Sequence, residues 1–175
     1  MNKIYFDNDT NMEILSEMDN IKSFDEFLFE YLDTIQKLSG VMVIVEDKIL
    51  LVKPVKFKGL TEKWSIPKGK IEKKQSTIEN AIRELKEETG IALTKDQIKE
   101  SDRTKIYYKK STRIRELTTY IIHLNKDELE IDINKKWAVH KKHLDTDEVF
   151  KAKFFSKKDA IDKIEVGQIP LLKFI

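Results

Sequence analysis

Three glutamates lie within five positions of one another in the segment 69–91, which reads GKIEKKQSTIENAIRELKEETGI. At 100° per residue in a helix, Glu84, Glu87 and Glu88 project within an arc of about 100° on one exposed face. Two carboxylates about 6 Å apart repel each other by roughly 3 kcal/mol at an effective dielectric constant near 20, so the cluster is unfavourable without a cation. Carboxylate oxygens without a nearby histidine or cysteine suit Mg²⁺ or Mn²⁺ better than zinc. The segment therefore predicts a divalent-cation site, and the alternative is a solvated helix face whose glutamates pair with nearby lysines.

The helix that carries these glutamates is well specified by its ends and by its apolar positions. Ser76 is the expected N-cap, with Glu79 three positions later completing a capping box, and Gly90 is placed to end the helix in a left-handed conformation. The turn-forming run 67–70 precedes the helix and must bring backbone close to whatever the glutamates hold. The apolar stripe that buries the other face of the helix consists of Ile78, Ala81, Ile82 and Leu85.

The spacing of residues across 69–91 resembles the Nudix box, Gly-x5-Glu-x7-Arg-Glu-apolar-x-Glu-Glu-x-Gly-apolar, the signature of the Nudix hydrolase superfamily. One fixed position departs, because Gln75 stands where the motif has its first glutamate. The resemblance implies an α/β (α+β) fold, a Nudix-like α/β/α sandwich with a mixed sheet, over residues 40–175. The positions that match the motif are Gly69, Arg83, Glu84, Leu85, Glu87, Glu88, Gly90 and Ile91.

This resemblance implies a magnesium-dependent pyrophosphohydrolase that cleaves a phosphoanhydride bond in a nucleoside diphosphate linked to another moiety. In such a reaction, cations bound by the box would neutralise charge on phosphate oxygens and lower the pKa of the attacking water. An acidic residue outside the box often ligates metal or acts as base in this family. Asp147 and Glu148 are the candidates, although their surroundings, LDTDEV, equally fit a solvated loop. The resemblance implies catalytic roles for Arg83, Glu84, Glu87, Glu88 and Glu148, and metal ligation by Gly69, Glu84, Glu87 and Glu88.

Gln75 suggests an alternative function. In many family members the equivalent glutamate pairs with the box arginine, here Arg83, or touches metal through water. An amide keeps hydrogen bonding but removes one negative charge, which predicts retained activity with weakened metal affinity. The alternative is a catalytically weakened Nudix domain that acts as a nucleotide- or RNA-binding module.

The substrate is expected to be a polyanion. Residues 48–74 carry nine lysines against two acids, and Lys109, Lys110, Arg113 and Arg115 continue this basic character. The segment WSIPKGKIE, residues 64–72, is similar to the one preceding the box in dinucleoside polyphosphate hydrolases, diphosphoinositol polyphosphate hydrolases and messenger RNA decapping domains. A nucleotide or dinucleotide, or an RNA 5′ end, is therefore the expected partner. The substrate-binding candidates are Lys53, Lys68, Gly69, Lys70 and Tyr108.

Aromatic and histidine side chains are more ambiguous. Tyr107, Tyr108 and Phe57 could stack a base, but aromatic residues in predicted strands more often belong to a core. The three histidines, His123, His140 and His143, lack metal-ligand spacing and are expected to be ordinary surface or strand residues. Trp137 is expected to be a lid contact or a simple anchor.

The remainder of the chain divides into an extension and a domain. Residues 1–39 carry nine acids against three bases and form an acidic helical N-terminal extension, with an amphipathic helix at 24–35 and a shorter one near 12–18. The extension could cap a homodimer interface, cover the substrate groove, or mimic a polyanion. In the domain, residues 40–175, we expect strands at 41–46 and 49–55 around a turn at Asp47–Lys48, with Pro54 near a strand end. Later strands are expected at 105–110, 117–124 and 149–155, followed by a last helix near 160–164 capped by Ser156.

Composition places the chain among ordinary globular proteins. Its 175 residues are 40% hydrophobic and 37% charged, and no apolar run approaches the ~20 residues that a membrane span needs. The N-terminus lacks the apolar stretch of a secretory signal, and the chain has no cysteine for disulfides or thiolate metal sites. We therefore expect a cytoplasmic protein with no membrane partner.

Overall fold

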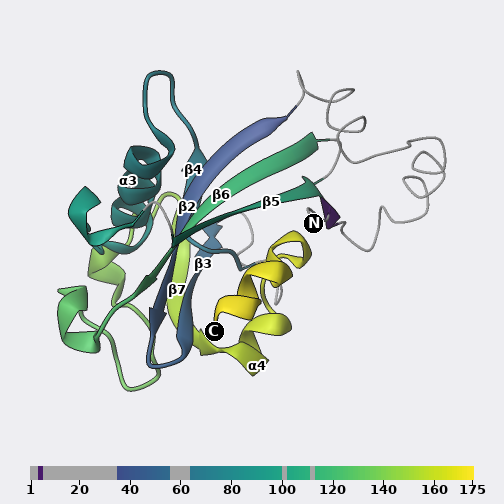
Figure 1. Ribbon diagram of the computed structural model, residues 1–175. Helices are drawn as coiled ribbons and strands as arrows, with labels where there is room; N and C mark the ends of the chain where they lie inside the picture. Colours follow the sequence, from purple (N-terminus) through teal and green to yellow (C-terminus); the bar gives the residue numbers. More distant parts are fainter. Residues whose placement is uncertain (1–3, 6–34, 56–63, 100–101, 111–112) are drawn as a thin grey trace.

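The computed structural model describes residues 4–5, 35–55, 64–99, 102–110 and 113–175 (Figure 1). A seven-stranded mixed sheet runs in the order β1-β5-β6-β2-β3-β7, and β4 pairs with β2 beside this path. The strands are β1 (Ile4–Tyr5), β2 (Gln36–Val45), β3 (Lys48–Pro54), β4 (Lys68–Lys70), β5 (Arg103–Lys110), β6 (Arg113–His123) and β7 (Val149–Ser156). The α-helices are α3 (Thr77–Thr89) and α4 (Lys157–Ile161), and the 3-10 helices are η4 (Lys95–Gln97), η6 (Lys126–Leu129), η7 (Lys141–His143) and η8 (Val166–Phe174).

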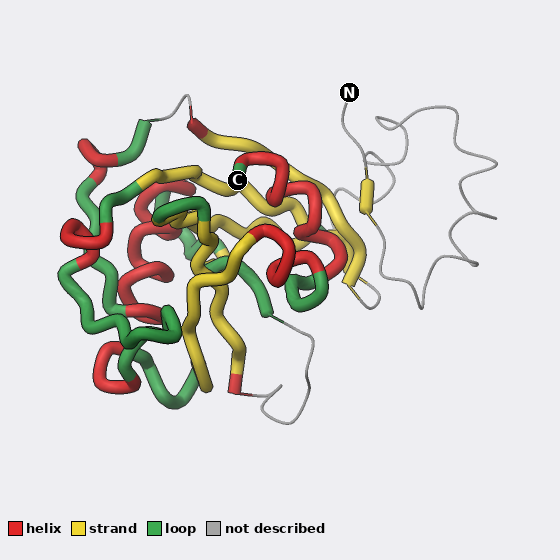
Figure 2. The backbone as a smooth tube through the Cα atoms, turned by 90° about the horizontal axis from the view of Figure 1, so that it is seen from below, coloured by secondary structure: helices red, strands yellow, loops and turns green. Residues whose placement is uncertain are grey.

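Alternation along β2 builds a hydrophobic core on each face of the sheet. Val41 and Val43 pack in the core that contains Leu85 of α3. Met42 and Ile44, which alternate with them, pack in a second core with Ala160 of α4 and with η8. Helical segments therefore cover both faces of the strands, as the two views show (Figures 1 and 2). The predicted α/β/α sandwich with a mixed sheet is confirmed.

The two edges of β2 are paired differently, and this difference positions the segment before α3. On one edge β2 runs parallel to β6 from the pair Gln36↔Arg115 onward. On the other edge β4 pairs with the beginning of β2, through Gly40↔Lys68, whereas β3 pairs only with its end, through Ile44↔Ile49. Because β3 pairs with β2 only at Ile44 and Val45, the edge of β2 at Leu38–Gly40 is free to pair with the backbone of β4.

The hairpin between β2 and β3 turns one residue earlier than predicted. Glu46 and Asp47 form the turn, with φ values of 46° and 56°, and Lys48 is already the first residue of β3. Two consecutive residues with positive φ are what a tight hairpin turn requires. Pro54 ends β3, as predicted.

The boundary expected between residues 39 and 40 falls inside β2, which begins at Gln36. The backbone of Ile4–Tyr5 also joins the sheet as β1, parallel to β5. The predicted helices at 12–18 and 24–35 lie outside the described residues, except for Ile35, which is not helical. Within the described residues, no helix combines the length and apolar character needed to cross a bilayer.

The C-terminal segment is tied to the approach to β4 by one buried glutamine. The α4 helix begins at Lys157, earlier than predicted, with Ser156 as its cap as expected, and η8 was not predicted. Gln168 of η8 is fully buried, and its Oε1 accepts a hydrogen bond from Ile66 N at 3.1 Å. Its Nε2 donates to Glu165 Oε2 at 3.1 Å. Gln168 therefore fixes the strand-like segment that leads into β4.

We predict that Gln168→Leu lowers the free energy of unfolding by about 1–3 kcal/mol, because the buried Ile66 N–H loses its acceptor. Urea unfolding followed by circular dichroism measures this difference. Ile169→Gln is the control, since Ile169 is 37% exposed and lies one residue away. Equal stability of the two variants would contradict the structural role of Gln168.

Candidate functional site

Both ends of α3 are fixed by the residues that the sequence indicates. Ser76 Oγ accepts from Glu79 N at 3.3 Å, and Ser76 N donates to Glu79 Oε2 at 3.0 Å, which completes the capping box. Gly90 has a φ of 78°, and its N–H donates to Lys86 O at 2.8 Å. The predicted capping residues of this helix are confirmed.

The glutamate cluster does not form an exposed face, and this expectation is wrong. Glu84 is only 8% exposed and Glu88 only 9%, whereas the side chain of Glu87 is 46% exposed. The reason is that α3 packs against β4 through this face. A Cβ on Gly69 would lie 2.0 Å from Glu84 Oε1, so the missing side chain of Gly69 creates the space that Glu84 fills.

Asn80, one turn before Glu84, joins α3 to both strands beneath it. This fully buried residue donates from Nδ2 to Ser39 Oγ at 3.0 Å and to the carbonyl of Gly69 at 3.4 Å. Its Oδ1 accepts from Arg83 Nη2 at 2.9 Å. Sequence reasoning missed Asn80, and the available signal was an amide beside the apolar stripe of a helix.

Arg83 pairs with two glutamates of the cluster. Its Nη2 lies 2.5 Å from Glu84 Oε1, and its Nη1 donates to Glu87 Oε2. Burial works against the charged guanidinium, but Glu84, Glu87 and Glu72 together raise the pKa of Arg83. Burial raises the pKa of Glu84, Arg83 opposes this effect, and the carboxylates of Glu87 and Glu148 add to it.

Glu88 is the most perturbed carboxyl group of the site. Its Oε2 accepts from the backbone N–H of Lys68 at 2.9 Å. Burial raises the pKa of Glu88 to about 8 despite the opposing effect of Lys68, and repulsion by Glu84 and Glu148 contributes to the rise. Glu148 therefore lies close to both buried glutamates, although sixty residues separate it from Glu88.

A backbone contact brings the loop of Glu148 to the end of α3. Asp145 N donates to Glu87 O at 3.3 Å, and Val55 N donates to Glu148 O at 2.9 Å. These contacts place the expected outside carboxylates, Asp147 and Glu148, beside the box.

A cavity of about 530 Å³ lies against these carboxylates and is defined here as the first cavity. Its lining residues include Lys68, Gly69 and Lys70 of β4 together with the acids Glu88, Asp147 and Glu148. Lys110 and Arg115, which the sequence assigned to the basic region facing the substrate, also line it, as do Gln36 and Glu165, which sequence reasoning missed. Gln36 and Arg115 meet through the β2–β6 register, which no local sequence pattern specifies.

Two predicted substrate contacts lie elsewhere. Tyr108 is only 1% exposed and packs against Gly167, so its ring offers no surface for a base, and that expectation is wrong. Lys53 is 8% exposed and lines a different cavity.

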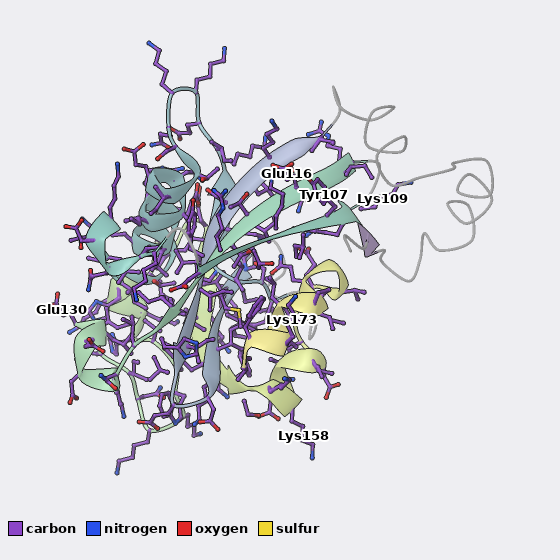
Figure 3. All side chains as sticks on the ribbon, viewed as in Figure 1. Tyr107, Lys109, Glu116, Glu130, Lys158 and Lys173 are labelled. Atoms are coloured by element: carbon purple, nitrogen blue, oxygen red, sulfur yellow. The ribbon has the colours of Figure 1, made fainter. Side chains whose placement is uncertain are left out.

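Tyr107 also makes an internal contact, donating its hydroxyl proton to Glu116 Oε2 at 2.8 Å (Figure 3). Burial, together with Glu116, raises the pKa of Tyr107. Phe57 lies outside the described residues.

The histidines and Trp137 have structural contacts of an ordinary kind. His140 Nδ1 accepts from Lys142 N at 3.3 Å, and His143 Nε2 lies 3.2 Å from Asp132 Oδ2. Trp137 packs edge-on against Phe154, with ring centroids 5.9 Å apart, and therefore serves as an anchor.

The donor chemistry of the site suits a hard divalent cation, but the carboxylates are engaged by protein groups. In the portion of the chain that the structure describes, no three carboxylate or imidazole side chains are grouped to hold a metal ion. Arg83 forms ion pairs with Glu84 and Glu87, and the backbone N–H of Lys68 donates a hydrogen bond to Glu88. Arg83 and the N–H of Lys68 thus compete with a cation for these carboxylates, and ligation by Gly69, Glu84, Glu87 and Glu88 stays a prediction.

Glu88 should make the stability of the metal-free protein depend on pH. Its folded-state pKa of about 8 exceeds the ordinary 4.5, so its stabilising contribution is complete below pH 4.5 and is lost as pH rises to about 8. In EDTA at pH 9, Glu88→Gln should be more stable than wild type by about 1–3 kcal/mol, and this difference should nearly vanish at pH 5. Urea unfolding at both pH values measures it, and a difference that is independent of pH would contradict a buried, ionisable Glu88.

Known proteins share the fold of this chain. A family model described as NUDIX domain matches residues 36–174. A C. elegans Ap4A hydrolase binary complex superposes with a TM-score of 0.58 at 22% identity, over 79% of this chain and 93% of that one. A MutT protein from Methanosarcina mazei Go1 gives a TM-score of 0.58 at 16% identity, over 80% and 91%.

A third structure extends over more of this chain. The bifunctional NMN adenylyltransferase/ADP ribose pyrophosphatase of Francisella tularensis, complexed with AMP and a Mn ion, gives a TM-score of 0.56 at 17% identity. The alignment covers 96% of this chain and 53% of that one. No curated protein matches this chain in sequence. At these sequence identities, the structural similarity establishes the fold alone. The family model spans most of the sequence and confirms the resemblance carried by residues 69–91. The chain therefore belongs to the NUDIX domain family, the Nudix hydrolase superfamily.

Proposed function

We propose that this protein is a magnesium- or manganese-dependent pyrophosphohydrolase that cleaves a phosphoanhydride bond in a nucleotide. The observation that carries this proposal is the convergence of Glu88 and Glu148 with Lys68 and Lys70 in the first cavity. A buried acid with a raised pKa that lies in a cleft beside charged groups, as Glu88 does, is typical of a functional site. The AMP and Mn ion bound to the F. tularensis protein are in keeping with this chemistry.

The carboxylates of α3 would hold the cation, with Glu84, Glu87 and Glu88 as ligands. A divalent ion bound there supplies charge neutralisation at phosphate oxygens and acidifies a water molecule. Glu148 is exposed at the wall of the first cavity, where its carboxylate can accept a proton from the attacking water. Asn80 and the Arg83 guanidinium would orient the helix face on which these groups lie.

The cations of the first cavity suit the phosphates of the substrate. Lys68, Lys70 and Arg115 line this space, and Lys110, which also lines it, is paired with Glu165. The amide of Gln36 lines the same space and can hydrogen-bond to a sugar or base. A nucleotide or dinucleotide with consecutive phosphates fits this distribution best, and Ap4A, for which the C. elegans hydrolase is named, belongs to that class.

A second candidate function is a binding module without turnover. Gln75 Oε1 and Arg83 Nε are both buried and lack a hydrogen-bond partner among the described residues. Without a carboxylate at position 75, Arg83 pairs with Glu84 and Glu87 instead. This pairing competes with cation binding and favours weakened catalysis.

A substrate panel distinguishes the two functions. With Mg²⁺ or Mn²⁺ present, we expect release of a mononucleotide from at least one of three groups: diadenosine polyphosphates, nicotinamide and flavin dinucleotides, and capped or triphosphorylated RNA. Glu87→Gln should lower kcat/KM by about 100-fold or more, because it removes a charged group from the reacting centre. Lys86→Gln, an exposed neighbour on α3, is the matched control. Affinity without turnover across the panel would favour the binding module.

Gln75→Glu should tighten the binding of Mg²⁺. A carboxylate at position 75 offers Arg83 another anionic partner and adds one negative charge, so Glu84 and Glu87 become available to the cation. We expect higher activity at low Mg²⁺ and a severalfold lower dissociation constant by isothermal titration calorimetry. Gln75→Ala, which removes the amide without adding charge, should not tighten binding. Identical metal titrations for Gln75→Glu and wild type would rule out this role.

A further inference from the structure

A second cavity, of about 660 Å³, lies beside β7 and is lined by lysines from distant parts of the chain. The only other titratable side chain among its lining residues is His140, and none of these residues is an aspartate or a glutamate. Such a concentration of one charge sign in a concave surface attracts anions. The six lysines are Lys53, Lys136, Lys141, Lys151, Lys153 and Lys163.

Backbone pairing holds these lysines around the second cavity. The segment 137–139 adds to the outer edge of β7, with Val139 N donating to Ala152 O at 3.0 Å and Phe154 N to Trp137 O at 2.9 Å. On the opposite side, Trp64 N donates to Lys163 O at 3.0 Å. The arrangement of charge is therefore fixed by the fold.

Five of these six lysines are not neutralised by an ion pair within the described part of the chain. No carboxylate there forms an ion pair with Lys136, Lys141, Lys151, Lys153 or Lys163. In contrast, Lys110 in the first cavity is paired with Glu165. The second cavity thus carries an excess of positive charge that a bound polyanion would balance.

Aromatic rings lie among these lysines. The ammonium group of Lys151 lies 5.1 Å from the ring centroid of Phe150, and that of Lys153 lies 5.0 Å from the ring of Phe155. Phe155 is only 4% exposed and belongs to a hydrophobic core, so of these two rings Phe150, which is half-buried at the cavity wall, is the one that a base could contact. A basic groove with aromatic side chains is the arrangement by which proteins bind single-stranded nucleic acid, through the phosphates and the base faces.

The two cavities are adjacent at the end of β3. Lys53 lines the second cavity and the next residue, Pro54, lines the first. Likewise, Trp64 lines the second and Ser65 the first, and Ser65 is hydrogen-bonded to Val52 of β3. An extended ligand could therefore pass from one cavity into the other, which a compact anion would not need to do.

We propose that the second cavity binds the phosphodiester chain of a single-stranded RNA whose 5′ end reaches the first cavity. The placement of the 5′ end rests on the proposed function, but binding of the chain does not. Hydrolysis and RNA binding are therefore measured separately.

The experiment uses a ten-nucleotide single-stranded RNA with a 5′-hydroxyl and a 3′ fluorophore, which contains no anhydride to be cut. Fluorescence anisotropy over a series of salt concentrations measures its binding to the full chain. The variant Lys136→Gln/Lys141→Gln/Lys151→Gln removes three exposed charges of the second cavity. The matched control, Lys86→Gln/Lys99→Gln/Lys173→Gln, removes three exposed charges that line neither cavity; Lys173 is labelled in Figure 3.

Wild type and the control should bind the RNA alike, whereas the second-cavity variant should bind about tenfold more weakly. Its slope of log affinity against log salt should be shallower by about 2, since each lost phosphate contact contributes about 0.7 for single strands. Absence of wild-type binding, or equal weakening in the control, would overturn the proposal. Displacement of the RNA by tripolyphosphate as effectively as by unlabelled RNA, at equal phosphate concentration, would overturn the assignment to a strand.

Hydrolysis of the whole substrate panel by the same three proteins separates the two proposals. Retained hydrolysis with weakened RNA binding in the second-cavity variant supports a distinct second site. If wild type binds the RNA through this cavity but hydrolyses nothing, the proposed function fails while the second site stands.

Discussion

The close approach of α3 to β4 is the constraint on which the site depends. Gly69 has no side chain, so the carboxylate of Glu84 lies directly over its backbone. Asn80 donates to the carbonyl of the same glycine, and Glu88 accepts from the next backbone N–H toward the N-terminus, that of Lys68. A helix and a short strand are thereby joined through buried polar groups that are hydrogen-bonded to one another.

This packing determines the electrostatics of the site. Carboxylates that are removed from water favour their protonated form, and both Glu84 and Glu88 have raised pKa values for this reason first. Arg83 opposes that effect at Glu84, and it does so by spanning Glu84 and Glu87. Arg83 thus takes its partners from the residues that are expected to hold a cation, and we propose that the amide at position 75 acts through this arginine.

The sheet brings the remaining groups to this helix. Parallel pairing of β2 with β6 sets Gln36 beside Arg115, and contacts of the loop before β7 place Glu148 near the end of α3. The early departure of β3 from β2 opens the space that β4 and the first cavity occupy. The same end of β3 lies between the first cavity, whose lining has both acids and bases, and the second cavity, whose charged residues are lysines.

Local patterns in the sequence were sufficient to predict α3, its capping box, its terminal glycine, the positions of the main strands along the chain, and the family. Each of these depends on residues close together in the chain. Burial of Glu84 and Glu88 could not be predicted this way, since a helical pattern shows which residues share a face but not what covers that face. The same limit explains Tyr108, whose strand position fits either a core or a stacking surface until Gly167 of the distant C-terminal segment is seen against its ring. Only the tertiary structure decided which lysines face which cavity, because strand register and loop docking, set by contacts between residues far apart in the chain, fix the direction of each side chain.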